Sequence, residues 1–246
     1  MASQEDKIEL SKSKNDYVAS SLKSSLGAIP FAGPLLSEIT CEIIPNQRED
    51  RIVEFAEILE ARLSDLEETF VKTQIKDEYF TDLIEEGIRQ ASRAISEERK
   101  EYIASIIANS LSSDDVDYIE SKHLMKILGE LNDIEMIWLK SFSLRTSEAH
   151  RKFRKKHQDI LSDIPIVIES SQQERDEAAL QESYKEHLAQ FGLLKPKFKQ
   201  EIKGRSQKKP QFDNSTGEKI KSGYQITELG KLLLKKLDLY NPKELE

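Results

Sequence analysis

The chain has 246 residues, of which 37% are hydrophobic and 33% are charged, and its formal net charge is −8. Residues 1–144 hold 16 Lys and Arg against 29 Asp and Glu, a balance of −13, whereas residues 145–246 hold 21 against 16, a balance of +5. The acidic balance excludes the first part as a surface that attracts nucleic acid or anionic lipid, so any such binding is expected in the second part.

Only 9 Gly and 7 Pro interrupt the chain, and its apolar residues recur with helical spacing, which favours amphipathic helices over disorder. Cys41 is the single cysteine and excludes an intrachain disulfide. The sequence contains neither a secretory signal nor a stretch of about 18 uncharged apolar residues, so we expect a cytoplasmic protein. In the first part the spacing predicts helices over residues 16–26, 35–44, 46–73, 77–95 and 96–111.

The most apolar segment of the chain, residues 27–45, reads GAIPFAGPLLSEITCEIIP and is broken by Gly and Pro. Such a segment suits a membrane-active or partner-binding hairpin, but it also suits a buried hairpin that fills a helical bundle. The predicted helix 35–44 carries Glu38 and Glu42 on one side and Ile39 and Ile43 on another. This ordinary amphipathic pattern favours the buried hairpin. The candidate membrane or partner residues are Ile29, Phe31, Leu35, Leu36 and Ile39.

The second part combines helices with the strongest β pattern of the chain. Gly192 has the place of a helix-ending glycine, and Thr227 caps the last helix. The order of helix, strand, long loop, strand and helix is that of the second half of a winged helix-turn-helix, with the loop as the wing. The predicted helices cover residues 116–130, 133–144, 145–160, 173–191 and 228–237, and the predicted strands cover 193–202 and 223–227, while the IPIVI run within 163–171 stays undecided.

Basic residues concentrate in the predicted wing, where residues 195–221 carry nine Lys and Arg against three Asp and Glu. A basic wing can neutralise phosphates, but the helix before it, residues 173–191, is too acidic for a typical recognition helix. The alternative is a winged module that serves packing or dimerisation. The candidate nucleic-acid-binding residues are Lys195, Lys197, Lys199, Lys203, Arg205, Lys208 and Lys209.

The sequence carries no pattern that predicts a catalytic or metal site. The four histidines, His123, His150, His157 and His187, are scattered, and no ligand pair stands near them. Neither a nucleophile elbow nor a phosphate-binding glycine loop is present. We therefore expect no enzymatic activity, no metal and no cofactor.

Four stretches carry a family resemblance: EERKEYIASIIANSLSSDD, HLMKILGELNDIEMIWLKSF, HLAQFGLL and the terminal GYQITELGKLLLKKL. Over residues 97–238 their order resembles the layout of the bacterial abortive infection alpha family. The resemblance implies a link to phage defence. The resemblance does not imply any enzymatic reaction, so it assigns no catalytic residue to this sequence.

Together these patterns predict a mainly α protein, with an N-terminal helical bundle at residues 1–113 and a winged-helix-like domain with a small β-hairpin at 114–246. The second domain would hold a basic insertion at 145–171 and the wing at 195–223. The expected function is a non-enzymatic interaction protein of phage defence that binds a protein partner or itself as an oligomer. The alternatives are a DNA-binding winged-helix regulator and a membrane-perturbing effector that uses residues 27–45.

Overall fold

The computed structural model describes most of the chain, and the contacts divide it into two compact units, Met1–Glu130 and Leu131–Glu246. The sequence places the division earlier, at 113/114, but helix α7 (Tyr118–Glu130) packs on α5 and α6 of the first unit. The residues described are 26, 28–29, 32–33, 36, 49–64, 77–111, 118–144, 148–203 and 207–240, with the side chains of 49, 201–203 and 207–208 left out.

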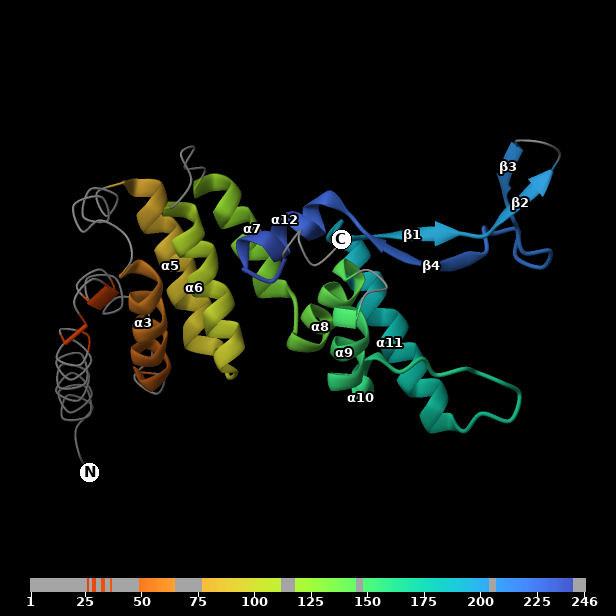
Figure 1. Ribbon diagram of the computed structural model, residues 1–246, viewed down its shortest axis with the longest axis horizontal. Helices are drawn as coiled ribbons and strands as arrows, with labels where there is room; N and C mark the ends of the chain where they lie inside the picture. The colour runs from red at the N-terminus through yellow and green to blue at the C-terminus, as the bar shows by residue number, and fades with distance from the viewer. Residues whose placement is uncertain are drawn as a thin grey trace, which may run out of the picture. The chain divides into compact units, whose positions relative to one another are not determined.

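The first unit is a helical bundle in which α3 and α7 each pack against both α5 and α6 (Figure 1). The predicted helical faces supply its core. Fully buried side chains include Phe55 on α3, Phe80 on α5 and Ile106 on α6. The helices span Glu49–Leu63 (α3), Glu78–Arg93 (α5), Glu97–Leu111 (α6) and Tyr118–Glu130 (α7).

Helix α5 shows how the sequence sets the ends of these helices. Asp77 has an extended backbone, and its Oδ1 accepts hydrogen bonds from the amides of Tyr79 (2.8 Å) and Phe80 (3.0 Å). This cap satisfies backbone donors that have no partner inside the helix. At the other end Ala94 is extended again, which separates α5 from α6.

Two of the five candidate membrane residues are described, and both lie in the core. Ile29 is 8% exposed and Leu36 is fully buried. The amide of Ala32, between them, donates a hydrogen bond to Oε2 of Glu60 on α3 at 2.8 Å. These contacts favour the buried hairpin at those positions. Phe31, Leu35 and Ile39 lie outside the described residues.

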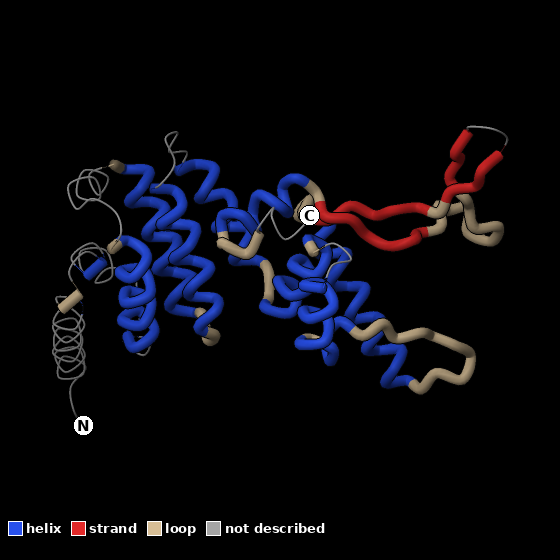
Figure 2. The backbone as a smooth tube through the Cα atoms, in the orientation of Figure 1, coloured by secondary structure: helices blue, strands red, loops and turns tan. Residues whose placement is uncertain are grey.

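The second unit joins helices to two antiparallel strand pairs, β1–β4 and β2–β3 (Figure 2). Both predicted strands are present, but the expected 193–202 strand is divided into β1 and most of β2, and the loop after it holds β3, which the sequence did not indicate. The elements are α8 (Asp133–Ser143), α9 (Glu148–Lys156), α10 (Gln158–Leu161), α11 (Gln172–Gln190), β1 (Leu194–Phe198), β2 (Gln200–Lys203), β3 (Gln207–Pro210), β4 (Lys221–Ile226) and α12 (Glu228–Lys236).

The expected mainly helical fold with a small antiparallel β element is therefore confirmed, whereas the winged-helix arrangement stays a prediction. The IPIVI run, residues 164–168, belongs to an open loop between α10 and α11. None of the helices in the described ranges is long and apolar enough to cross a membrane.

We expect Gly230→Ala to destabilise the second unit. A Cβ at this position would lie 2.4 Å from the carbonyl oxygen of Leu193, which is backbone and cannot rotate away. Thr227 holds Gly230 close to the backbone of Leu193. Its Oγ1 accepts a hydrogen bond from the Gly230 amide at 3.1 Å and donates one to the Gly192 carbonyl at 2.6 Å. Overpacking of this kind costs about 1–3 kcal/mol.

Urea unfolding followed by circular dichroism measures this loss. Ser183→Ala, on the exposed face of α11, is the control. A loss for Gly230→Ala below about 0.5 kcal/mol, the usual size of a surface effect, would contradict the close approach.

Candidate functional site

The candidate site is the β1–β4 ribbon, which extends away from the helices of the second unit (Figure 1). Helix α11 ends in a Schellman-type motif, with the Leu193 amide donating to the Leu188 carbonyl and the Gly192 amide to the Ala189 carbonyl, both at 3.0 Å. Gly192 has a φ of 70°, which glycine adopts without strain. The turn leads the chain directly from α11 into β1.

One face of the ribbon is buried at its base. In the antiparallel register Leu194 lies opposite Ile226 and Pro196 opposite Tyr224, so these four residues share a face. Leu194, Ile226 and Tyr224 are each at most 9% exposed, β1 contacts α11 and β4 contacts α8. The Tyr224 ring also packs edge-on against Phe142 of α8 at 6.4 Å between centroids. Burial of this face fixes the orientation of both strands.

Polar contacts hold the same face to α11. The Tyr224 hydroxyl donates to Oε1 of Glu182 at 2.7 Å, and Lys221 Nζ donates to Oε1 of Glu186 at 2.7 Å. Desolvation and the hydrogen bond to Glu182 raise the pKa of Tyr224 to about 12. The hydrogen bond to Glu186 raises the pKa of Lys221. Lys221, whose side chain is 45% exposed, is thus paired with carboxylates of its own unit.

Glu182 remains ionised in this cluster. Desolvation acts to raise its pKa, but the hydrogen bond from Tyr224 and the charges of Lys185 and Lys221 together lower it. Lys185 also lies over the ring of Trp138, with Nζ 4.8 Å from the ring centroid. The cluster therefore joins α11 to β4 through groups of opposite charge, and α11 to α8 through the contact of Lys185 with the Trp138 ring.

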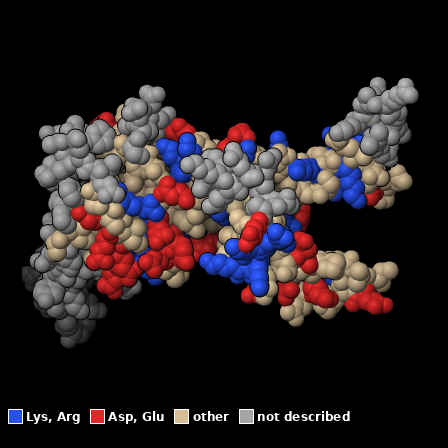
Figure 3. Space-filling model, in the orientation of Figure 1, with Lys and Arg blue, Asp and Glu red and all other residues tan. Residues whose placement is uncertain are grey.

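The opposite face of the ribbon presents lysines to solvent. Lys195 lies opposite Gln225 and Lys197 opposite Gly223, and Lys195, Lys197 and Gln225 are exposed. Because successive side chains alternate between the faces of a strand, burial of Leu194 and Tyr224 places these lysines outward. Figure 3 shows the blue of Lys and Arg along this ribbon.

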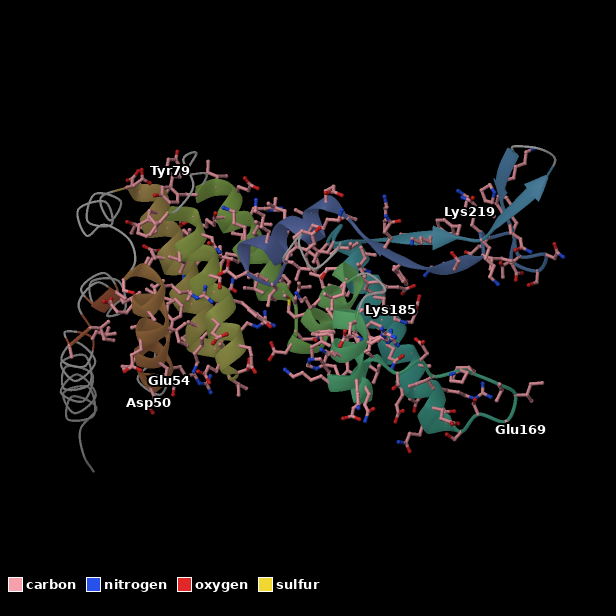
Figure 4. The ribbon with its side chains drawn as sticks, viewed as in Figure 1. Asp50, Glu54, Tyr79, Glu169, Lys185 and Lys219 are labelled. Carbon is pink, nitrogen blue, oxygen red and sulfur yellow. The ribbon has the colours of Figure 1, made fainter. Side chains whose placement is uncertain are left out.

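Beyond a register shift at Lys197/Phe198, the chain continues into the β2–β3 pair and the turn that follows it, which form the end of the ribbon. Basic and aromatic residues continue along this end. Phe212, which is 51% exposed, forms an isolated bridge with Lys219. Lys219 Nζ lies 5.5 Å from the centroid of the Phe198 ring, and Figure 4 labels Lys219 at this end. Lys199 and Lys209 are exposed as well. The end of the ribbon thus combines positive charge with an accessible aromatic ring.

The structure brings some of the seven predicted basic residues together on the ribbon. Lys195, Lys197 and Lys199 follow one another in and after β1, and Lys209 is in β3. In the β2–β3 pair Lys203 lies opposite Gln207 and Lys208 lies opposite Ile202, and the side chains of both lysines are not described. Arg205 lies outside the described residues.

Two ribbon residues, Gln225 and Phe212, were missed by reasoning from charge alone. The alternation of β4, in which Tyr224 and Ile226 are apolar, contained the signal that Gln225 faces outward with the lysines. No comparable signal marked Phe212, because its exposure depends on the turn that follows it.

That turn is built by Asp213. Its Oδ1 accepts from the amides of Ser215 (2.8 Å) and Thr216 (3.0 Å) and from the Ser215 hydroxyl. Gly217, with a φ of 70°, closes the turn, and its amide donates to the Asp213 carbonyl at 2.9 Å. The hydrogen bonds from the Ser215 side chain, the Thr216 amide and the Ser215 amide lower the pKa of Asp213 to about 2.

A second basic surface of this unit lies on α9. Arg151, Lys152, Lys155 and Lys156 are exposed there, and Lys152 pairs with Glu148 at 2.8 Å. Two histidines flank them. Desolvation and the charge of Arg154 lower the pKa of His150, and desolvation and the charge of Lys156 lower the pKa of His157. Both are therefore neutral at pH 7, and the charge of α9 comes from Lys and Arg.

The described side chains include no cluster of three or more His, Cys, Asp or Glu that could hold a metal ion. Comparison with known proteins finds no matching family model, no matching curated protein and no matching solved structure.

We expect the carboxylate of Asp213 to titrate near pH 2 and Ser215→Ala to move the midpoint upward, since that variant removes the largest cause of the lowered pKa. A lowered folded-state pKa stabilises the turn above the unfolded value of about 3.9, and this contribution is lost as pH falls through about 2. Side-chain carboxyl NMR shifts measure the midpoint, with Asn214→Ala as the control. A wild-type midpoint near 4 would contradict the hydrogen-bonded turn.

Proposed function

We propose that the protein is a non-enzymatic binding protein whose ribbon contacts the sugar-phosphate backbone of nucleic acid. The outward row formed by Lys195, Lys197 and Gln225, opposite a buried face, is the observation that supports it most. Lys195 and Lys197 lie two residues apart on one face, a spacing of about 6.7 Å along a strand, so both can contact one phosphate backbone.

The acidic surface of α11 argues for binding that does not depend on sequence. This helix precedes the ribbon, as a recognition helix precedes a wing, but Glu174, Asp176 and Glu177 are exposed on it. Such carboxylates repel phosphates and keep α11 out of a duplex groove. Contact is then limited to the ribbon, whose lysines recognise charge and not base sequence.

The exposed ring of Phe212 favours a single strand over a duplex. Bases stack on aromatic side chains when they are unpaired, and such stacking contributes about 1–3 kcal/mol per base. Phe212 lies beside Lys219, so phosphate and base contacts are available at the same end of the ribbon.

The wider role in phage defence is proposed on the family resemblance alone, and a protein partner remains part of that proposal. The membrane alternative has less support, since Ile29 and Leu36 of segment 27–45 lie in the core of the first unit.

We expect Lys195→Gln with Lys197→Gln to weaken single-stranded DNA binding and to flatten its salt dependence. Loss of two phosphate contacts reduces the slope of log K against log salt by about 1.4 for a single strand. Fluorescence anisotropy with a labelled oligonucleotide over a salt series measures both quantities. The matched control is Arg93→Gln with Lys126→Gln, which removes two exposed charges from the first unit.

Phe212→Ala separates the aromatic contribution from the charge. It should weaken binding of single-stranded DNA about 5- to 150-fold, leave duplex binding nearly unchanged and keep the salt slope. No salt-dependent binding by the wild-type protein, or equal losses in the ribbon variant and its control, would refute the proposed function.

A further inference from the structure

The loop between α10 and α11 exposes three consecutive apolar side chains. Ile166 is 46% exposed, Val167 is 59% exposed and Ile168 is 98% exposed. Single exposed apolar residues are common, but a contiguous set at the end of a projecting loop is typical of an interaction surface. Figure 2 shows the loop extending from the helices of its unit, and Figure 4 labels Glu169 at its end.

Hydrogen bonds hold this loop in one conformation. The Arg175 guanidinium donates to the carbonyls of Val167, Ile168 and Ser170 at 3.1–3.3 Å. Near the other end of the loop, the side-chain amide of Gln181 donates to the carbonyls of Ile160 and Ser162. A loop fixed in this way loses little conformational freedom when it binds, so its apolar residues are already positioned for a partner.

The residues around this loop are strongly acidic. We name residues 163–177 the arm; it holds five Asp and Glu against Arg175 alone, a balance of −4. Arg175 already binds loop carbonyls. Within the chain, the side chains of Asp176 and Glu177 accept hydrogen bonds from Gln172 and Gln173, which are neutral. The arm thus presents apolar residues inside a field that attracts a basic surface.

Helix α9 of the same chain has the complementary character. Its residues 148–156 hold five Lys and Arg against Glu148, a balance of +4. Arg151, Lys155 and Lys156 are exposed and form no ion pair with any residue that the structure describes. Phe153 is half-buried, and the aliphatic stems of the lysines add apolar area. Figure 3 shows blue over α9 and red along the arm.

We infer that two copies of this chain form a dimer in which the arm of each copy docks on α9 of the other. Arg154 of α9 and Asp163 of the arm already pair within one chain at 3.6 Å, which leaves −3 on the arm and +3 on α9 for a second copy. This match favours the pairing of arm with α9 over contact between two arms, where −3 would face −3. A two-fold axis makes both contacts at once, and it closes the assembly because each arm and each α9 is occupied. The ribbon takes no part in the contact, so this inference does not depend on nucleic-acid binding.

Sedimentation velocity of the full chain without nucleic acid tests the dimer, over a concentration series at low and high salt. We expect a dimer that weakens as salt rises. Ile168→Asp places a charge in each of the two contacts and should raise the dimer dissociation constant about 100-fold, tenfold for each. The matched control is Ile95→Asp, which alters a side chain 87% exposed in the first unit and should leave the dimer intact.

A charge exchange identifies α9 as the surface that the arm contacts. Lys155→Glu with Lys156→Glu should dissociate the dimer, and adding Glu169→Lys with Asp176→Lys should restore it. Circular dichroism verifies that each variant is folded.

A wild-type chain that stays monomeric at its highest soluble concentration in low salt would overturn the inference. Assemblies larger than a dimer, or equal effects of Ile168→Asp and Ile95→Asp, would also overturn it. If Ile168→Asp dissociates the dimer but Glu169→Lys with Asp176→Lys fails to restore the dimer lost in Lys155→Glu with Lys156→Glu, the pairing of the arm with α9 is refuted.

Discussion

Burial of one face of the β1–β4 ribbon is the constraint on which the rest of the second unit depends. Leu194 and Ile226 are almost inaccessible, and Tyr224 between α8 and α11 adds a hydrogen bond to Glu182 at 2.7 Å. A slip of one residue in register would bury Lys195 and expose Leu194, which costs both desolvation of a charge and loss of apolar burial. The core contact therefore determines which side chains the ribbon presents.

The second unit carries positive and negative charge on different surfaces, which its net charge does not reveal. Lys221 pairs with Glu186, whereas Lys195 and Lys197 on the other face are exposed and form no ion pair with any residue that the structure describes. The arm and α9 carry opposite charges of equal size, at −4 and +4. One unit can therefore bind an anionic ligand at the ribbon and a second copy through the arm, since the two surfaces use different residues.

Helical spacing and caps made most of the helices predictable. The expected 173–191 helix is α11 (Gln172–Gln190). The break between the expected 116–130 and 133–144 helices is a capping box, in which Asn132 and Glu135 each bind the other's amide at 2.8–2.9 Å. Strand β3 was not predictable, because Gln207–Pro210 is polar and ends in proline, without the alternation that marks a half-buried strand.

The candidate site was predictable in composition but not in arrangement. Nine basic residues in 195–221 marked the region, yet charge alone could not distinguish Lys221, which binds Glu186, from Lys197, which faces solvent. That distinction arises because α11 passes beside β4, a tertiary contact with no local signal. The same holds for the arm, whose IPIVI run suits a strand but lies in a loop that Arg175 holds open.

Lysine acetylation footprinting tests the central claim most directly, with the wild-type chain probed in the presence and absence of single-stranded DNA and read by mass spectrometry. The account predicts that DNA protects Lys195 and Lys197, leaves Lys126 of the first unit unchanged, and finds Lys221 poorly reactive in both states. Protection of Lys126 equal to that of Lys195, or protection confined to Lys155 and Lys156 of α9, would contradict it.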